Sequence, residues 1–419
     1  MKNKIFILTL LTTIAISINA QADGEYDSDN LHWTFYNGVL TVSKKDGATS
    51  DVMPDYGDSY APWYSYKDQI TTVVINDGLS NVGGYAFSHL HNLTSVSIPD
   101  SVKSIDRGAF VNAWNLESIT IPKDVTSIGD WAFYSNGKLK NINIPDTVTS
   151  IGDRAFQGDD SLTNFSIPSS LTSIGNEAFE GATGLGDVVL PSGVISIGDS
   201  AFAGSDLTSI NLPNTLKNIG YGAFAETDLT SIEIPNSVTS IGGEAFRETN
   251  ITEVDIPNSV TNISPYAFAY MDSLKSITIP ENLTFDPMSI IDNSGAGYGL
   301  DELYDAISAC KNDNECDFYE EVKADFQANA SMKNINIYCK GDVQKCEENI
   351  SWLQEYQDIF GTPSFKISVA TVRENNPDGS STIKTWDGKL IGYKNKRIYT
   401  IDEANAVAGK VNSVKIRYR

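Results

Sequence analysis

The side chains best suited to catalysis or metal binding are scarce in this sequence. Its three histidines are His32, His89 and His91, and the last two flank Leu90. A metal site needs further ligands at a defined spacing, so we interpret these histidines as exposed turn residues. No serine-hydrolase, zinc-protease, phosphate-binding or dinucleotide-binding motif occurs in the chain. The sequence therefore predicts no catalytic residues, no cofactor and no metal site.

The four cysteines are Cys310, Cys316, Cys339 and Cys346, all in the C-terminal part of the chain. An even number of cysteines at short spacings in an exported protein favours two disulfides. Of the three pairings, we prefer Cys310–Cys316 with Cys339–Cys346. A zinc site is the alternative, although neither spacing is CxxC. Oxidised cysteines would not serve as nucleophiles.

The N-terminus predicts export. Lys2 and Lys4 precede an apolar run over 5–18, which is too short to span a membrane and is typical of a signal peptide over 1–22. We expect cleavage after Ala22, and no later segment is apolar enough to be a transmembrane helix. The net charge of −24 argues against nucleic acid and anionic membranes as partners. The expected location is secreted, cell-surface or periplasmic.

A repeated sequence unit forms the middle of the chain and positions the residues around it. Ala-Phe pairs begin at nine positions, spaced by 23 residues five times and then by 22 residues three times: Ala86, Ala109, Ala132, Ala155, Ala178, Ala201, Ala223, Ala245 and Ala267. A fixed period of this size indicates a solenoid whose units cannot fold alone.

The apolar positions of one unit predict how it folds. In the unit 116–133, Ile119 and Ile121 alternate with polar residues, as in a strand with one buried face, and Pro122 should end that strand. Ile128 belongs to a second inward-facing segment, followed by Gly129 at a turn. The next four residues are too few for a full helix, so we expect a helical or 3₁₀ turn that points Phe133 into the core.

The pattern LxxIxIPxxVxxIGxxAF resembles the BspA-like, treponemal-type leucine-rich repeat family. The match covers about half the chain. The resemblance implies a leucine-rich repeat solenoid, mainly β with short 3₁₀ or helical turns. It also implies a secreted or surface protein of a family with members implicated in adhesion, and it supplies no catalytic residues.

Composition divides the rest of the chain. We predict a β-rich N-terminal cap over 23–69, repeats over 70–285, a linker over 286–300 and a small α+β domain over 301–419. In the cap, Asn37-Gly38 predicts a hairpin turn, and the aromatic residues around Trp63 should pack against the first repeat; carbohydrate binding is their alternative role. In the C-terminal domain we expect a strand ending at Cys339 and a hairpin between 365–372 and 382–386.

Two groups of side chains differ from the small polar residues that otherwise cover the repeat surface. Trp114, Trp131 and Tyr134 occupy turn positions in neighbouring repeats, and clustered exposed aromatics are typical binding anchors. Packing over the turns is the alternative. Glu233, Glu253 and Asp255 should lie on adjacent strands as an acidic patch for a cation or basic partner, or simply as a solvated surface.

The sequence thus favours a non-enzymatic binding module or adhesin that recognises a protein or glycan on a host or bacterial surface. Two alternatives stay open. In one, the solenoid delivers a cryptic enzymatic C-terminal domain to its substrate. In the other, the protein is a structural component attached to the cell envelope.

Overall fold

The computed structural model describes residues 24–27, 30–57, 59–163, 165–280 and 283, and seven strands between 335 and 398. The predicted signal peptide, the predicted linker, Cys310, Cys316 and Cys346 lie outside these residues. Cys339 is described only as backbone of a strand. In the described part of the chain, no helix is both long and apolar enough to cross a bilayer.

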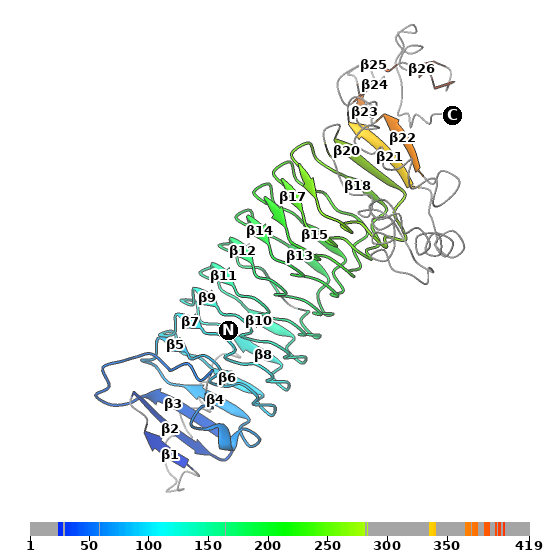
Figure 1. The fold of residues 1–419 in the computed structure, drawn as a ribbon. Coiled ribbons are helices and arrows are strands. Elements are labelled where there is room, and N and C mark those ends of the chain that lie inside the picture. The colour runs from blue at the N-terminus through cyan, green and yellow to red at the C-terminus, as the bar shows by residue number, and fades with distance from the viewer. Residues whose placement is uncertain are drawn as a thin grey trace, which may run out of the picture.

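The repeats stack into the predicted solenoid, an elongated rod with the N-terminal sheet at one end (Figure 1). Every repeat contributes a two-residue strand whose second residue is a buried Ile or Val. These strands pair in parallel as one nine-stranded sheet. In chain order they are β5 (Asn81–Val82), β7 (Ser104–Ile105), β9 (Ser127–Ile128), β11 (Ser150–Ile151), β12 (Ser173–Ile174), β14 (Ser196–Ile197), β16 (Asn218–Ile219), β17 (Ser240–Ile241) and β19 (Asn262–Ile263).

A second set of longer strands precedes the prolines of the repeats, and we call their surface the strand face. Parallel pairs join β4 (Thr72–Ile75) to β6 (Ser95–Ser97), β8 (Ser118–Thr120) to β10 (Asn141–Asn143), β13 (Asp187–Val189) to β15 (Ser209–Asn211), and β18 (Glu253–Asp255) to β20 (Ser276–Pro280). In the repeat between β10 and β13, Phe165 replaces the usual Ile or Val. Its ring packs edge-on against Phe156 and Phe179, with centroids 5.6 and 4.9 Å away, and no strand is described at 165–167.

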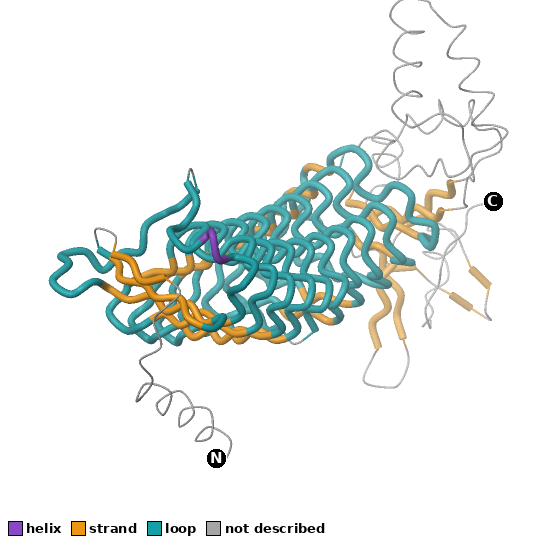
Figure 2. The backbone as a smooth tube through the Cα atoms, turned by 90° about the horizontal axis from the view of Figure 1, so that it is seen from below, coloured by secondary structure: helices purple, strands orange, loops and turns teal. Residues whose placement is uncertain are grey.

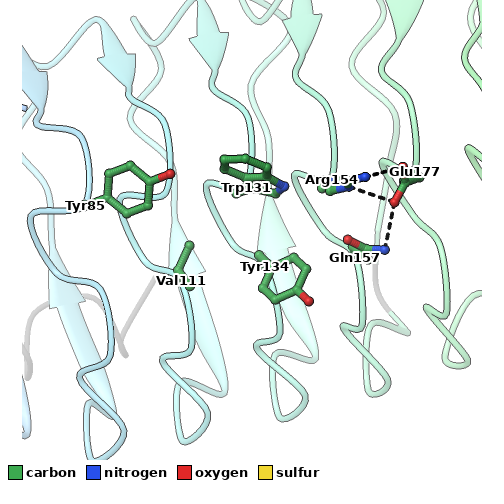
Figure 3. A pocket seen from close by; sticks show the side chains of 7 residues that line it. All are labelled: Tyr85, Val111, Trp131, Tyr134, Arg154, Gln157 and Glu177. Atoms are coloured by element: carbon green, nitrogen blue, oxygen red, sulfur yellow. Dashed lines mark hydrogen bonds and ion pairs between the residues drawn. The ribbon is translucent and has the colours of Figure 1, made fainter. Parts of the chain in front are cut away.

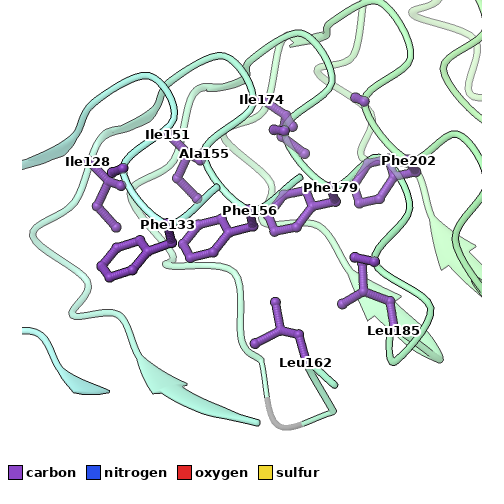
Figure 4. Packing of buried hydrophobic residues seen from close by; sticks show 14 of the residues in the cluster. Ile128, Phe133, Ile151, Ala155, Phe156, Leu162, Ile174, Phe179, Leu185 and Phe202 are labelled. Carbon is purple, nitrogen blue, oxygen red and sulfur yellow. The ribbon is translucent and has the colours of Figure 1, made fainter. Parts of the chain in front are cut away.

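The Ala-Phe segments form hydrogen-bonded turns, which Figure 2 shows as loops along the rod. All nine phenylalanines are buried, as predicted. Rings from neighbouring repeats stack with centroids 5.3–5.7 Å apart, and Figure 4 shows part of this row. The amide of each Phe, up to Phe246, donates to the carbonyl of the Ala in the next repeat at 2.8–2.9 Å. The repeats are therefore joined by backbone hydrogen bonds as well as by a continuous apolar core.

The glycine after the short strand is required by the neighbouring repeat. A Cβ added to any of six such glycines would lie 2.5–2.7 Å from a backbone atom of the preceding repeat: Gly129, Gly152, Gly175, Gly198, Gly220 and Gly242. The sequence indicated a turn here. The structural reason is close approach of two backbones, which no side chain tolerates.

The N-terminal cap continues the strand face. Strands β1 (Gly24–Asp27), β2 (Leu31–Tyr36) and β3 (Val39–Lys44) are antiparallel, and β3 then pairs in parallel with β4 of the first repeat. Asn37 and Gly38 both have positive φ, 47° and 80°, which confirms the predicted hairpin turn. After η1 (Tyr64–Tyr66) the chain enters the first repeat. Trp63 is buried, stacks on Phe87 at 5.6 Å and donates its indole N–H to the Ala86 carbonyl at 2.7 Å. It therefore ends the row of phenylalanines.

Beyond β20, the parallel sheet continues with β21 (Ile335–Lys340) and β22 (Phe365–Val369). The hairpin is formed by β23 (Thr371–Asn375) and β24 (Ser381–Thr385), so its first strand starts later than we expected from the sequence. Strand β25 (Leu390–Ile391) pairs with β24, and β26 (Tyr393–Lys394) pairs with β27 (Arg397–Ile398). The helical part of the predicted α+β domain lies outside the described residues.

Candidate functional site: a hollow on the turn face

We call the surface formed by the Ala-Phe turns the turn face. Two residues of every turn have left-handed backbone conformation. The first precedes the Ala-Phe pair, with φ of 51–63°: Tyr85, Gly108, Trp131, Arg154, Glu177, Ser200, Gly222, Glu244 and Tyr266. The second lies two residues after the Phe, with φ of 55–71°: His89, Asn112, Ser135, Gly158, Gly181, Gly204, Glu226, Glu248 and Tyr270.

The stacking of repeats imposes this conformation. The left-handed residues direct their amides at the next repeat, as when Trp131 N–H donates to Asp153 and Arg154 N–H donates to Asn176, both at 2.8 Å. A non-glycine residue in this conformation costs about 1–2 kcal/mol. Gly108 and Gly222 show that glycine is accommodated at the first position. Large side chains are nevertheless present there in most repeats, although glycine would be less strained.

In five neighbouring repeats, side chains at the first left-handed position and directly after the Phe surround an open hollow of about 450 Å³. Its lining residues are Tyr85, Val111, Trp131, Tyr134, Arg154, Gln157 and Glu177, shown in Figure 3. They come from the turns that follow β5, β7, β9, β11 and β12. The hollow therefore crosses the repeats along the axis of the rod.

One end of the hollow is aromatic. Gly108 has no side chain, and a Cβ there would lie 2.5 Å from the ring of Tyr85, so this ring lies over Gly108. The Arg107 guanidinium lies over the Trp131 ring at 4.1 Å, and that of Arg154 lies 5.8 Å from the same ring. These cation–π contacts restrain the indole before any ligand arrives.

The other end is polar and already paired. Arg154 donates to both carboxylate oxygens of Glu177, at 2.7 and 2.6 Å, and Gln157 donates to the same carboxylate at 3.1 Å (Figure 3). The hydrogen bond from Arg154 lowers the pKa of Glu177. Beside it, burial and the neighbouring Glu177 raise the pKa of Glu180. The donors and acceptors of this end are thus fixed by a bidentate ion pair.

The structure brings together only two of the three predicted aromatic residues. Trp131 and Tyr134 line the hollow, whereas Trp114 stacks on His91 with ring centroids 3.9 Å apart. Trp114 Nε1 also donates to Asn112, whose amide lies 3.2 Å from His89 Nδ1. His89 and His91 are half-buried here, not exposed as we expected, and burial lowers the pKa of His89. Among the described residues, no three His, Cys, Asp or Glu side chains are placed to hold a metal ion.

The predicted acidic residues lie on the strand face, away from the hollow's lining. Glu253 and Asp255 belong to β18, and Glu233 lies in the preceding repeat, where no strand is described. All three are exposed. A second open hollow of about 500 Å³ on this face lies beside Phe165 and is lined by Ser, Thr and Asn side chains of β8 and β10. The acidic residues do not line it.

Five lining residues are not predicted from the sequence: Tyr85, Val111, Arg154, Gln157 and Glu177. Aligning the repeats on the residue before the Ala-Phe pair places Tyr85, Gly108, Trp131, Arg154 and Glu177 in one column. That column is the signal in the sequence. It is inconspicuous because its members, Tyr, Gly, Trp, Arg and Glu, share no chemical type.

In a comparison with known proteins, the repeats match the model of one protein family. The model described as BspA type Leucine rich repeat region, with six copies, matches residues 61–186 and 172–294, more than half of the chain. No curated protein matches the sequence.

Three solved structures illustrate the similarity. A leucine-rich repeat protein from Bacteroides ovatus is 28% identical, with a TM-score of 0.49, over 64% of this chain and 75% of that one. One from Eubacterium ventriosum is 24% identical, with a TM-score of 0.41, over 63% and 82%. The pneumococcal vaccine antigen PcpA is 18% identical, with a TM-score of 0.41, over 84% and 100%.

Proposed function

Because the chain belongs to the BspA-type leucine-rich repeat family, we propose that it is an exported binding protein. In this proposal the solenoid presents the turn-face hollow to a protein or glycan on a host or bacterial surface. The leader is the segment 1–22, and the mature chain starts next to the cap strand β1. Neither a cofactor nor a covalent step is involved.

One observation carries the proposal: the hollow collects large side chains in a conformation that favours glycine. Strained backbone at a surface cluster is typical of functional sites. The cluster also combines aromatic rings with a fixed Arg–Glu pair, which is the mixture found in binding sites. The two repeats after the hollow have the small residues Ser200 and Gly222 at this position, and large side chains return at Glu244 and Tyr266.

The mature chain, residues 23–419, tests the proposal. It is applied to an array of matrix proteins, mucins, polysaccharides and bacterial cells, beside the variant Trp131→Asn and the control Trp114→Ala. Asparagine tolerates the left-handed conformation of residue 131. We expect at least one ligand to bind the native chain and the control but not the variant. Absence of binding to the whole array would contradict the proposal.

A further inference from the structure

We propose that the turn-face hollow binds a neutral saccharide, with sugar rings packed on Tyr85 and Trp131 and hydroxyl groups bonded to the Arg154–Gln157–Glu177 end. This inference rests on the proposed function, because it names the ligand of the same site. It concerns the lining residues alone and assigns no role to Trp114 or to the acidic residues of the strand face.

The aromatic end has room because one repeat lacks a side chain. Tyr85 and Trp131 lie two repeats apart, and the residue between them at the same position is Gly108. Val111 and Tyr134 add apolar surface to the same hollow. The C–H faces of a pyranose ring are apolar and pack against such rings, as other amphipathic groups do. The second glycine at this position, Gly222, lies between Ser200 and Glu244 and has no aromatic neighbour at that position.

The polar end is suited to hydroxyl groups. Glu177 accepts hydrogen bonds from both Arg154 and Gln157, which holds three planar groups in one arrangement. A carboxylate has about four lone-pair sites, and a guanidinium has five N–H donors. Arg154 uses two of its five donors in these bonds, so guanidinium N–H donors and the Gln157 carbonyl oxygen remain for hydroxyl groups.

The charges of the hollow favour a ligand without net charge. A cationic ligand would be repelled by the Arg107 guanidinium, which lies over one face of Trp131 at 4.1 Å. An anionic ligand that pairs with Arg154 would have to displace Glu177, which already forms a bidentate pair with it. A neutral polyhydroxylated ligand on the other face of the ring meets neither cost.

The size of the hollow also favours a small ligand over a protein surface. A volume of about 450 Å³ falls in the range of small-molecule sites, roughly 300–1,000 Å³. A stable protein partner would cover about 600–1,000 Å² on each side and would extend well beyond these seven residues.

The test is affinity electrophoresis of the mature chain through gels that contain glucan, mannan, xylan or galactan. Parallel gels contain the anionic polymers polygalacturonate and hyaluronan. Any retained protein is then titrated with neutral oligosaccharides of the retaining polymer by calorimetry. The variants are Trp131→Asn and Tyr85→Asn, with Trp114→Ala as the control because Trp114 is an exposed tryptophan outside the hollow. Gln157→Ala probes the polar end without changing a left-handed residue.

We expect a neutral polymer to retain the native chain, and each of Trp131→Asn and Tyr85→Asn to weaken binding by about tenfold or more. Gln157→Ala should weaken it as well, and the control should stay within about twofold of the native chain. If Trp131→Asn does not fold, Tyr85→Asn and Gln157→Ala decide the result.

Four results would overturn the inference. Binding to the anionic polymers alone would show that the ligand is charged. Saccharide binding that the lining variants leave unchanged would place the site elsewhere. Binding to matrix proteins or mucin polypeptide without any polysaccharide would refute the saccharide, although the proposed function would stand. A chain that binds none of these ligands would refute both.

Discussion

Asp159 is a carboxylic acid buried in the core beside Asn136. Its side chain is completely buried, and its Oδ1 accepts a hydrogen bond from the Asn136 amide at 2.7 Å. In the adjacent turn, Asn136 Oδ1 accepts from the Ala113 amide at 2.7 Å. Asp159 Oδ2 has no hydrogen-bond partner among the described residues. Burial therefore raises the pKa of Asp159 well above its ordinary value of 3.8.

Asp159→Asn should stabilise the protein at pH 8. The folded chain binds the Asp159 proton more tightly than the unfolded chain, so this residue favours folding most below pH 3.8, and its contribution declines as the pH rises through the folded pKa. The amide keeps the acceptor for Asn136 and carries no charge. We expect a gain on the order of 1–3 kcal/mol at pH 8, which shrinks at pH 4.

Urea unfolding of both proteins at the two pH values measures this difference. Asp160→Asn is the matched control, because the neighbouring Asp160 is exposed, and it should change stability little. A gain from Asp159→Asn that is equal at pH 4 and pH 8 would show that the charge of Asp159 is not its cause.

At this scale the sequence predicts the core better than the surface. Phe, Ala and Ile positions recur with a fixed period, so their burial follows from the pattern alone. The buried acid could not be predicted, because the same turn position holds Ala113, Asn136, Asp159 and Ala182 in successive repeats. The left-handed residues were hidden for a similar reason: Tyr85 and Trp131 do not resemble the glycine that this conformation favours.

The structural elements are held in place by close approach between repeats. Short strands contribute only two residues each, so little of their stability is internal. The turns add backbone hydrogen bonds from one repeat to the next, and the glycines permit the short distance across which these hydrogen bonds form. A single methyl group at such a glycine should therefore separate two repeats.

Gly175→Ala tests this relation. The added Cβ would lie 2.6 Å from the carbonyl carbon of Gly152 and 2.8 Å from the Asp153 amide nitrogen, both backbone atoms that cannot rotate away. We expect a loss of about 1–3 kcal/mol, as for overpacked cores, measured by thermal unfolding. In Gly186→Ala, the control, the added Cβ meets nothing within 4 Å. Equal losses in the two variants would indicate a backbone effect instead of a clash.

Element order followed from the repeat, but interruptions of the strand face did not. The cap hairpin was predictable because Asn-Gly at 37–38 suits a two-residue turn. The gap next to β10 depends on Phe165, whose ring fits between Phe156 and Phe179. In the sequence, Phe165 fits the apolar pattern as Ile or Val would. The pattern does not show that its ring enters the row of stacked phenylalanines. The polar hollow beside it was missed for that reason.

The described repeats form a one-dimensional stack in which each repeat contacts mainly its two neighbours (Figure 1). Trp63 closes the phenylalanine row at the cap end, and β21 and β22 extend the strand face beyond β20. The hollow lies in the first part of the rod, on the turns that follow β5 to β12. The column of residues before Ala-Phe could have located it in the sequence, but its shape depends on Gly108 and on how Tyr85 turns over it.

Deletion of one whole repeat tests the equivalence of the units. Removing residues 207–228 joins Asp206 to Leu229 and keeps the period, so Phe202 should stack on Phe246 as it now stacks on Phe224, 5.7 Å away. We expect a folded protein with cooperative urea unfolding and a stability lowered by about one repeat's share. Removing only 207–217 is the control: the deletion is smaller, yet it puts the apolar positions out of phase and should abolish cooperative unfolding. The larger deletion should be tolerated because the stack requires a constant period and not a constant length. If both deletions unfold the chain alike, the repeats are not interchangeable.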